Sequence, residues 1–277
     1  MLRKLRREKR RKRSRGKIMS VIYYEEHYDG ITIFETKEIE LKKPAYLVLG
    51  LPDAGLVGAI SVSHLARTLN MEEYGGIESY RYFPPIVVVH KGSLYPPLRF
   101  FHKDNLVVLV PEIAIPTSAI YPLSYAITDY AQRKGFDFIV SITGTPIPNR
   151  MEIDKPKVYW LATGKTATDV GKKLNIPMFE EGLLVGPYAV ILKESLKRRM
   201  NNLLLLVESY MEFPDPEAAA TALEVLSKVI GVEVDVKKLL EEAEIIKLKS
   251  REMMKSTHRM LTRMGKGYEY QMPMLYT

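Results

Sequence analysis

Residues 46–58 decide the fold, and they read YLVLGLPDAGLVG. The apolar run Tyr46–Leu49 is typical of a short buried strand, and a glycine-rich turn follows it at once. A helix-like run then extends from about Leu56 to Leu69. A strand, a turn and a helix in this order predict the crossover connection that joins parallel strands.

The same alternation continues on both sides of this unit. Runs rich in apolar and β-branched residues predict further strands at Ile31–Leu41, Ile86–His90, Leu106–Val110, Phe138–Ile142, Leu183–Val185 and Leu203–Val207. Helices are predicted at Ala119–Lys134, where Gly135 ends the run, and near Tyr188–Met200. Because crossover helices cover both faces of a sheet, residues 19–213 are predicted to form a three-layer α/β/α domain with a mostly parallel or mixed sheet.

The pattern changes after Phe213. Asp215 is suited to cap a helix that begins at Pro216, and an alanine-rich run continues from there to Gly231. A second helix is predicted from just after Asp235 to about Met264. Since neither helix leads back to a strand, residues 214–264 are predicted to be a helical annex, packed on the domain or on neighbouring subunits.

The composition excludes several classes of protein. The chain of 277 residues has no cysteine, which rules out disulfides, thiolate nucleophiles and zinc sites built on cysteine. No apolar run approaches the roughly 20 residues that span a bilayer. The basic start is not followed by the apolar stretch of a secretory signal, so a cytoplasmic protein is expected.

The net charge of +8 belongs to the start of the chain. Residues 1–17 hold eleven Lys or Arg and one Glu, which is +10, so residues 18–277 carry 8 − 10 = −2. Residues 1–18 are therefore expected to be a disordered basic leader, which is a solvated tail, a contact for nucleic acid or acidic surfaces, or an over-extended start before Met19. The body lacks the basic stripe with interleaved aromatic residues that nucleic acid requires, so nucleic acid is not predicted as a partner of the body.

Two segments are candidates for small-molecule chemistry. The turn Gly50–Gly58 could direct backbone N–H groups at a phosphate, but its glycines follow neither dinucleotide-binding nor P-loop spacing. Tight turning and close helix–sheet packing explain them better. The loop Thr143–Arg150 could bind an anion, although its prolines favour a purely structural role. The five histidines show no metal-ligand spacing, and no nucleophile or base stands out, so no catalytic residue, metal or cofactor is predicted.

The end of the annex carries a methionine-rich stripe. Positions 239, 243, 246, 250, 253, 257, 260 and 264 alternate in four–three spacing, and the stripe is apolar apart from Ser250 and Thr257. Its methionines Met253, Met260 and Met264 make it adaptable. The stripe is predicted to pack either on the chain's own core or along a neighbouring subunit.

Three segments in this order resemble the archaeal relatives of the eukaryotic proteasome-assembly chaperones. They are the turn Gly50–Gly58, the segment Gly182–Gly186, and Pro214-Asp215-Pro216 with Ala218-Ala219, followed by Leu239 and Ala243-Glu244. The resemblance covers roughly residues 40–250. It implies an α/β/α domain similar to nucleoside-phosphorylase-like folds, used to bind proteins and assembled as a homo-oligomer. We expect a tetramer or pentamer.

The last three residues, Leu275, Tyr276 and Thr277, match the hydrophobic–tyrosine–any ending by which proteasome activators dock between α-subunits of the core particle. An apolar side chain, an aromatic ring with a hydroxyl, and a free carboxylate form a compact docking element. Residues 265–277 are thus predicted to be a flexible docking tail. The resemblance implies a chaperone, adaptor or activator of the proteasome, not an enzyme. The alternative is a nucleoside- or phosphate-handling phosphorylase or hydrolase that uses the Gly50–Gly58 turn.

Overall fold

The structure of the protein is a computed structural model, and it describes residues 22–266 and 269–271. Within that part of the chain, nine strands form one mixed sheet in the order β1-β2-β4-β7-β8-β3-β9-β12-β10. The central strands β8, β3, β9 and β12 run parallel, and the strands on either side of them run antiparallel to their neighbours. The strands of the sheet are β1 (Tyr24–Tyr28), β2 (Ile31–Glu35), β3 (Tyr46–Leu49), β4 (Glu72–Glu78), β7 (Leu98–Lys103), β8 (Leu106–Pro111), β9 (Phe138–Pro146), β10 (Val158–Thr163) and β12 (Asn201–Ser209).

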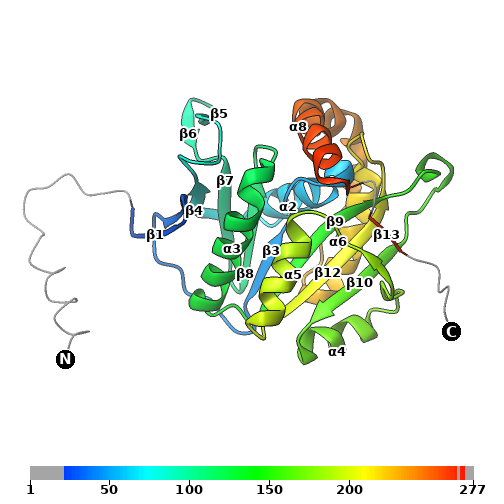
Figure 1. Cartoon of the computed structure of the whole chain (residues 1–277), viewed down its shortest axis with the longest axis horizontal. Coiled ribbons are helices and arrows are strands. Elements are labelled where there is room, and N and C mark those ends of the chain that lie inside the picture. The colour runs from blue at the N-terminus through cyan, green and yellow to red at the C-terminus, as the bar shows by residue number, and fades with distance from the viewer. Residues whose placement is uncertain (1–21, 267–268, 272–277) are drawn as a thin grey trace, which may run out of the picture.

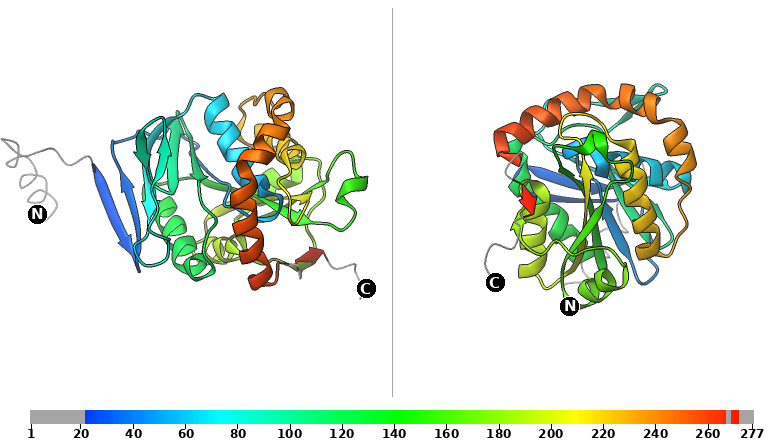
Figure 2. Two further views of the ribbon diagram at one scale, coloured as in Figure 1. Left: turned by 90° about the horizontal axis from the view of Figure 1, so that it is seen from above. Right: turned by 90° about the vertical axis from the view of Figure 1, so that its right-hand side faces the viewer.

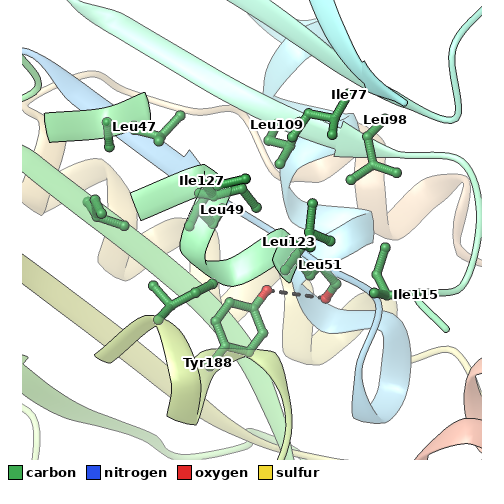
Figure 3. Packing of buried hydrophobic residues seen from close by; sticks show 14 of the residues in the cluster. Leu47, Leu49, Leu51, Ile77, Leu98, Leu109, Ile115, Leu123, Ile127 and Tyr188 are labelled. Atoms are coloured by element: carbon green, nitrogen blue, oxygen red, sulfur yellow. Dashed lines mark hydrogen bonds between the residues drawn. The ribbon is translucent and has the colours of Figure 1, made fainter. Parts of the chain in front are cut away.

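Helices cover both faces of this sheet (Figure 1). On one face lie α2 (Val57–Thr68), α4 (Lys165–Lys173) and α6 (Pro216–Ile230), and on the other lie α3 (Ile120–Lys134) and α5 (Pro187–Lys197). In β3, Val48 packs under the first group, whereas Leu47 and Leu49 pack under the second, and all three are fully buried. Figure 3 shows the second of these cores, where the Tyr188 hydroxyl donates a hydrogen bond to the Leu51 carbonyl oxygen at 3.2 Å.

The α/β/α prediction is confirmed, with a mixed sheet. The predicted strand at Ile31–Leu41 ends earlier, at Glu35, and the predicted strand Leu183–Val185 is the short β11 (Gly182–Leu183). The predicted strand Ile86–His90 is shorter and lies outside the main sheet. Only β5 (Val88–His90) forms there, and it pairs with β6 (Ser93–Tyr95) in a separate hairpin, because Ile86 and Val87 remain about half exposed rather than packing on the core.

The helices predicted in the region 214–264 are present and pack on the domain. Helix α6 is part of the layer itself, since its alanine-rich side packs on α2 and β12. The second predicted helix is broken at Glu242 into α7 (Lys237–Glu241) and α8 (Ala243–Met264). Helix α8 passes from one face of the sheet to the other, since Ile246 and Met254 lie in the first core while Met260 and Leu261 lie in the second (Figure 2).

Three single-turn helices and one short strand complete the description. The turns are η1 (Ala54–Leu56) after β3, η2 (Thr117–Ala119) before α3, and η3 (Arg150–Glu152) after β9. Helix α8 contacts both η1 and η2, so it lies over the edge of the sheet where the parallel strands end. Beyond α8, the strand β13 (Tyr270–Gln271) pairs antiparallel with β11.

Candidate functional site

The glycines of the turn after β3 let the backbone pack closely. A Cβ atom on Gly50 would lie 2.2 Å from the Gly58 carbonyl oxygen, and one on Gly58 would lie 2.3 Å from the Ile142 carbonyl oxygen. Gly55 has a φ of 62°, a left-handed conformation that glycine adopts without strain. Its carbonyl oxygen accepts a hydrogen bond from the Asp215 amide at 2.8 Å. The turn thus joins α2, β9 and the start of α6.

A buried ion pair lies at the carboxyl edge of the parallel strands, directly beside this turn. The Lys266 ammonium is 2.9 Å from Asp53 Oδ2 and 2.7 Å from Glu269 Oε2, and it donates to the Val185 carbonyl oxygen at 3.2 Å. Lys266 and Asp53 are essentially inaccessible to solvent, with 1% and 0% exposure. We call Lys266, Asp53, Glu269, Thr143 and the backbone of Val185 the Lys266 cluster.

The two carboxylates of the Lys266 cluster have further partners. Asp53 accepts hydrogen bonds from Thr143 Oγ1 at 2.6 Å and from the Ala54 amide at 2.8 Å. Glu269 accepts one from the Val185 amide at 2.9 Å. The edge at which open α/β sheets bind ligands is therefore occupied by the protein's own side chains.

Burial and charge oppose each other in this cluster. Burial alone would lower the pKa of the Lys266 ammonium, but Asp53 and Glu269 beside it raise that pKa above its ordinary value. Burial raises the pKa of the Glu269 carboxyl, and the neighbouring Lys266 only partly opposes this shift. Lys266 consequently stays charged at neutral pH, held by two acidic groups.

The loop Thr143–Arg150 ends in a second buried pair. Arg150 donates from Nε and Nη2 to the two oxygens of Asp215, at 2.8 and 3.0 Å, and both residues are at least 98% buried. Asp215 also caps α6 by accepting from the Ala218 amide at 3.0 Å. The arginine considered for anion binding is thus committed to an internal carboxylate, in a fork geometry that suits it.

The methionines of the C-terminal stripe lie in three different settings. Met260 is buried in the chain's own core, and Met264 packs against that core from its edge. Met253 is half-buried and lines a groove of about 770 Å³ between α2 and α8. Burial on the protomer accounts for Met260, and the predicted subunit interface at these three residues stays a prediction.

The predicted docking residues Leu275, Tyr276 and Thr277 lie outside the described residues, as does the basic leader 1–18. The root of the predicted tail is described, however, and there the expectation of a free tail from Gly265 onward needs correction. Lys266 is buried and Tyr270–Gln271 form a strand, because the charges of Asp53 and the backbone of residues 182–185 hold this segment against the body. Figure 1 places β13 at the periphery of the molecule.

Sequence reasoning misses the Lys266 cluster. The stretch Gly265-Lys266-Gly267 indicates only the end of a helix, and Asp53 lies 213 positions away from Lys266. Asp53 in the turn is the one available signal, since a carboxyl at the end of a buried parallel strand requires a partner. Nothing in the sequence identifies which lysine supplies it.

Two kinds of feature are absent from the described residues. None of the helices in residues 22–266 combines the length and apolar character that a bilayer crossing requires. Over the same described part of the chain, no three His, Asp or Glu side chains are grouped so that they could hold a metal ion.

Comparison with known proteins identifies one family and several proteins of similar sequence or fold. The model of the PAC2 family matches residues 47–254. An uncharacterized protein of Methanocaldococcus jannaschii is 27% identical over 240 residues, which span 87% of this chain and 98% of the relative. The structure of PbaA from Pyrococcus furiosus, an archaeal homolog of proteasome-assembly chaperone, is 28% identical with a TM-score of 0.74, covering 80% of this chain and 96% of PbaA. PbaB from the same organism, an archaeal proteasome activator, shares the fold at 21% identity with a TM-score of 0.68, covering 80% of this chain and 98% of PbaB.

Proposed function

The chain belongs to the PAC2 family, and from this premise we propose that it is a non-enzymatic protein that docks on the α-ring of the proteasome core particle through Leu275, Tyr276 and Thr277. The family match and the similarity to PbaA support the resemblance found in the three sequence segments. Docking would serve assembly of the particle or opening of its gate. The tail lies beyond residues 47–254, so its role rests on its own chemistry.

One observation carries this proposal: the carboxyl edge of the sheet is filled by the chain's own C-terminal segment. An enzyme of this architecture would bind substrate at that edge, but here Lys266 and Glu269 occupy it and α8 lies over it. Arg150, the other candidate for anion binding, is likewise buried in an internal pair. A site closed from within favours binding through an outer surface.

The similarity to PbaA and PbaB supports the proteasome as the partner. A hydrophobic–tyrosine–any ending fits that partner. Leu275 would fill an apolar pocket, Tyr276 would contribute a ring and a hydroxyl, and the carboxylate of Thr277 would pair with a lysine of the pocket. One such contact is small, and ordering a tail costs part of its free energy, so we propose that several tails of a homo-oligomer dock together.

Binding to immobilised core particle, measured by surface plasmon resonance, tests the proposal. We compare the parent, a variant that lacks Leu275–Thr277, Tyr276→Ala and, as a matched control in the same tail, Met272→Ala. The deletion and Tyr276→Ala should abolish binding while leaving the melting temperature unchanged, and Met272→Ala should bind like the parent. Equal binding by the deleted form would refute docking through the tail.

A C-terminal amide separates the carboxylate from the side chains. It removes the charge of Thr277 and leaves Leu275 and Tyr276 in place. We expect binding to fall nearly as far as in the deletion variant, because the carboxylate is the only charged group of the last three residues. Full affinity of the amide would show that the side chains alone suffice.

A further inference from the structure

Lys266 joins three segments that lie far apart in the sequence. Its ammonium has three N–H donors, and the structure provides three acceptors: Asp53 after β3, the Val185 carbonyl oxygen before α5, and Glu269 before β13. Because every donor is used and the group is buried, this ammonium is satisfied within the protein. It is placed to hold the segment that follows α8, rather than to bind a ligand.

The residues on either side of Lys266 also hold the segment that follows α8 against the body. Helix α8 ends at Met264, and its cap Gly265 has a φ of 75° that turns the chain out of the helix. Lys266 enters the core at the next position. Glu269 then accepts from the Val185 amide, and Tyr270 and Gln271 pair with Leu183 and Gly182. A two-residue strand is a weak attachment by itself. The charged contacts of the Lys266 cluster are therefore the main tie between the C-terminal segment and the body.

We propose that Lys266 is a positioning residue that fixes the root of the docking tail, so that the tail begins at residue 272 and not at Gly265. This consequence rests on the proposed function. The tail then has six residues, 272–277, in place of the thirteen residues 265–277. At 3.3–3.6 Å per residue its greatest reach is about 20 Å rather than about 45 Å.

The shorter tail matters when several tails of one oligomer bind one ring. The effective concentration of a tethered group falls roughly as the −3/2 power of its length, provided that the tail spans the sites. Lengthening the tail from six to thirteen residues therefore lowers the effective concentration by about threefold for each tail that binds after the first. A free peptide of the last residues gains nothing from Lys266 in either case.

The test uses Lys266→Met and the double variant Asp53→Asn with Lys266→Met, in the full-length protein. The double variant removes both charges, and burial already raises the pKa of the Glu269 carboxyl in the parent. The double variant lacks the contacts of Lys266 and can be measured even if Lys266→Met alone fails to fold. Lys155→Met is the control, because Lys155 forms an exposed pair with Glu224.

Amide hydrogen exchange of residues 270–271 is the primary measurement. We expect the double variant to lose protection there by at least about tenfold, while α3 and β9 keep theirs, and the control to match the parent. Unchanged protection at residues 270–271 in the folded double variant would overturn the proposal. This result does not depend on the proteasome, so it stands even if the parent fails to bind the α-ring.

Affinity is the second measurement, made on core particle with the intact protein and with a peptide of residues 272–277. We expect the double variant to bind at least about threefold more weakly than the parent, and the peptide, whose own affinity does not depend on Lys266, to displace the double variant at a correspondingly lower concentration. A double variant that has lost protection but binds as tightly as the parent would show that the root of the tail does not position it.

Discussion

Replacing Gly58 by Ala isolates the packing role of the turn Gly50–Gly58. Gly58 lies in the first turn of α2, and a methyl group there would lie 2.3 Å from the Ile142 carbonyl oxygen and 2.9 Å from Gly50 Cα. Ordinary contacts of a Cβ atom begin near 3.4 Å, so α2 and β9 must separate by about 1 Å. Both contacts are with backbone, which no side-chain rotation can relieve.

Two opposing effects determine how far Gly58→Ala lowers the free energy of unfolding. Overpacking of this kind costs about 1–3 kcal/mol, whereas alanine gains up to about 1 kcal/mol over glycine as a helix former. The gain is smaller near the start of a helix, which leaves a net loss of about 1–2 kcal/mol. For a domain of this size the melting temperature should fall by about 2–8 °C.

Thermal denaturation followed by circular dichroism measures this loss, and Gly92→Ala is the control. Gly92 lies in the β5–β6 hairpin with a φ of 79°, and no atom lies within 4 Å of the place that a methyl group would take. Gly92→Ala therefore measures the cost of placing alanine at this φ, without a steric clash. We also titrate the parent and Gly58→Ala calorimetrically with a nucleoside and with inorganic phosphate, and expect no saturable heat. An unchanged melting temperature, or saturable binding by the parent that Gly58→Ala loses, would refute the structural role of the turn.

The remaining predictions concern stability, pH and assembly. Arg150→Met leaves Asp215 buried without its cation and should cost about 3–5 kcal/mol in urea denaturation, against less than about 0.5 kcal/mol for the exposed Lys155→Met; equal losses would contradict the pairing. Because the pKa of Lys266 is raised in the folded state, its charge stabilises the protein below about pH 10.5 and that stability is lost as pH rises through the folded pKa. The melting temperature of the parent should therefore fall more steeply above that pH than that of the double variant Asp53→Asn with Lys266→Met. Parallel curves would contradict a stabilising charge on Lys266. Met253→Glu should split the proposed homo-oligomer in analytical ultracentrifugation with little loss of stability, since Met253 is only half-buried. A homo-oligomer that stays intact would remove Met253 from the proposed interface.

The sequence predicts the centre of the sheet well and its flanks poorly. The runs at β3, β8 and β9 are apolar at consecutive positions because both faces of these strands are covered, and such runs are easily found. Strand β4 is missed because it contains two glycines and three glutamates, which are rare in strands. Its Gly75 is required by packing, since a Cβ atom there would lie 2.2 Å from the Phe34 carbonyl oxygen.

The candidate site is likewise predictable from the sequence only in part. The turn Gly50–Gly58 is predicted correctly as a packing element, because glycine spacing alone excludes the known phosphate-binding loops. The burial of Lys266 is not predictable, because a lysine between two glycines after a helix has the composition of a solvated end. Its partner, Asp53, is brought to it only when α8 crosses the edge of the sheet. Charged pairs of such sequence separation leave no periodic signal.

Photo-crosslinking from position 276 tests the central claim most directly. Tyr276 is replaced by p-benzoylphenylalanine, which keeps an aromatic ring at the proposed docking position, and the full-length protein is irradiated with core particle. We predict adducts with α-subunits, identified by mass spectrometry, and their loss when an excess of peptide 272–277 is present. Adducts confined to the protein itself, while it still binds the particle, would contradict docking through the C-terminal tail.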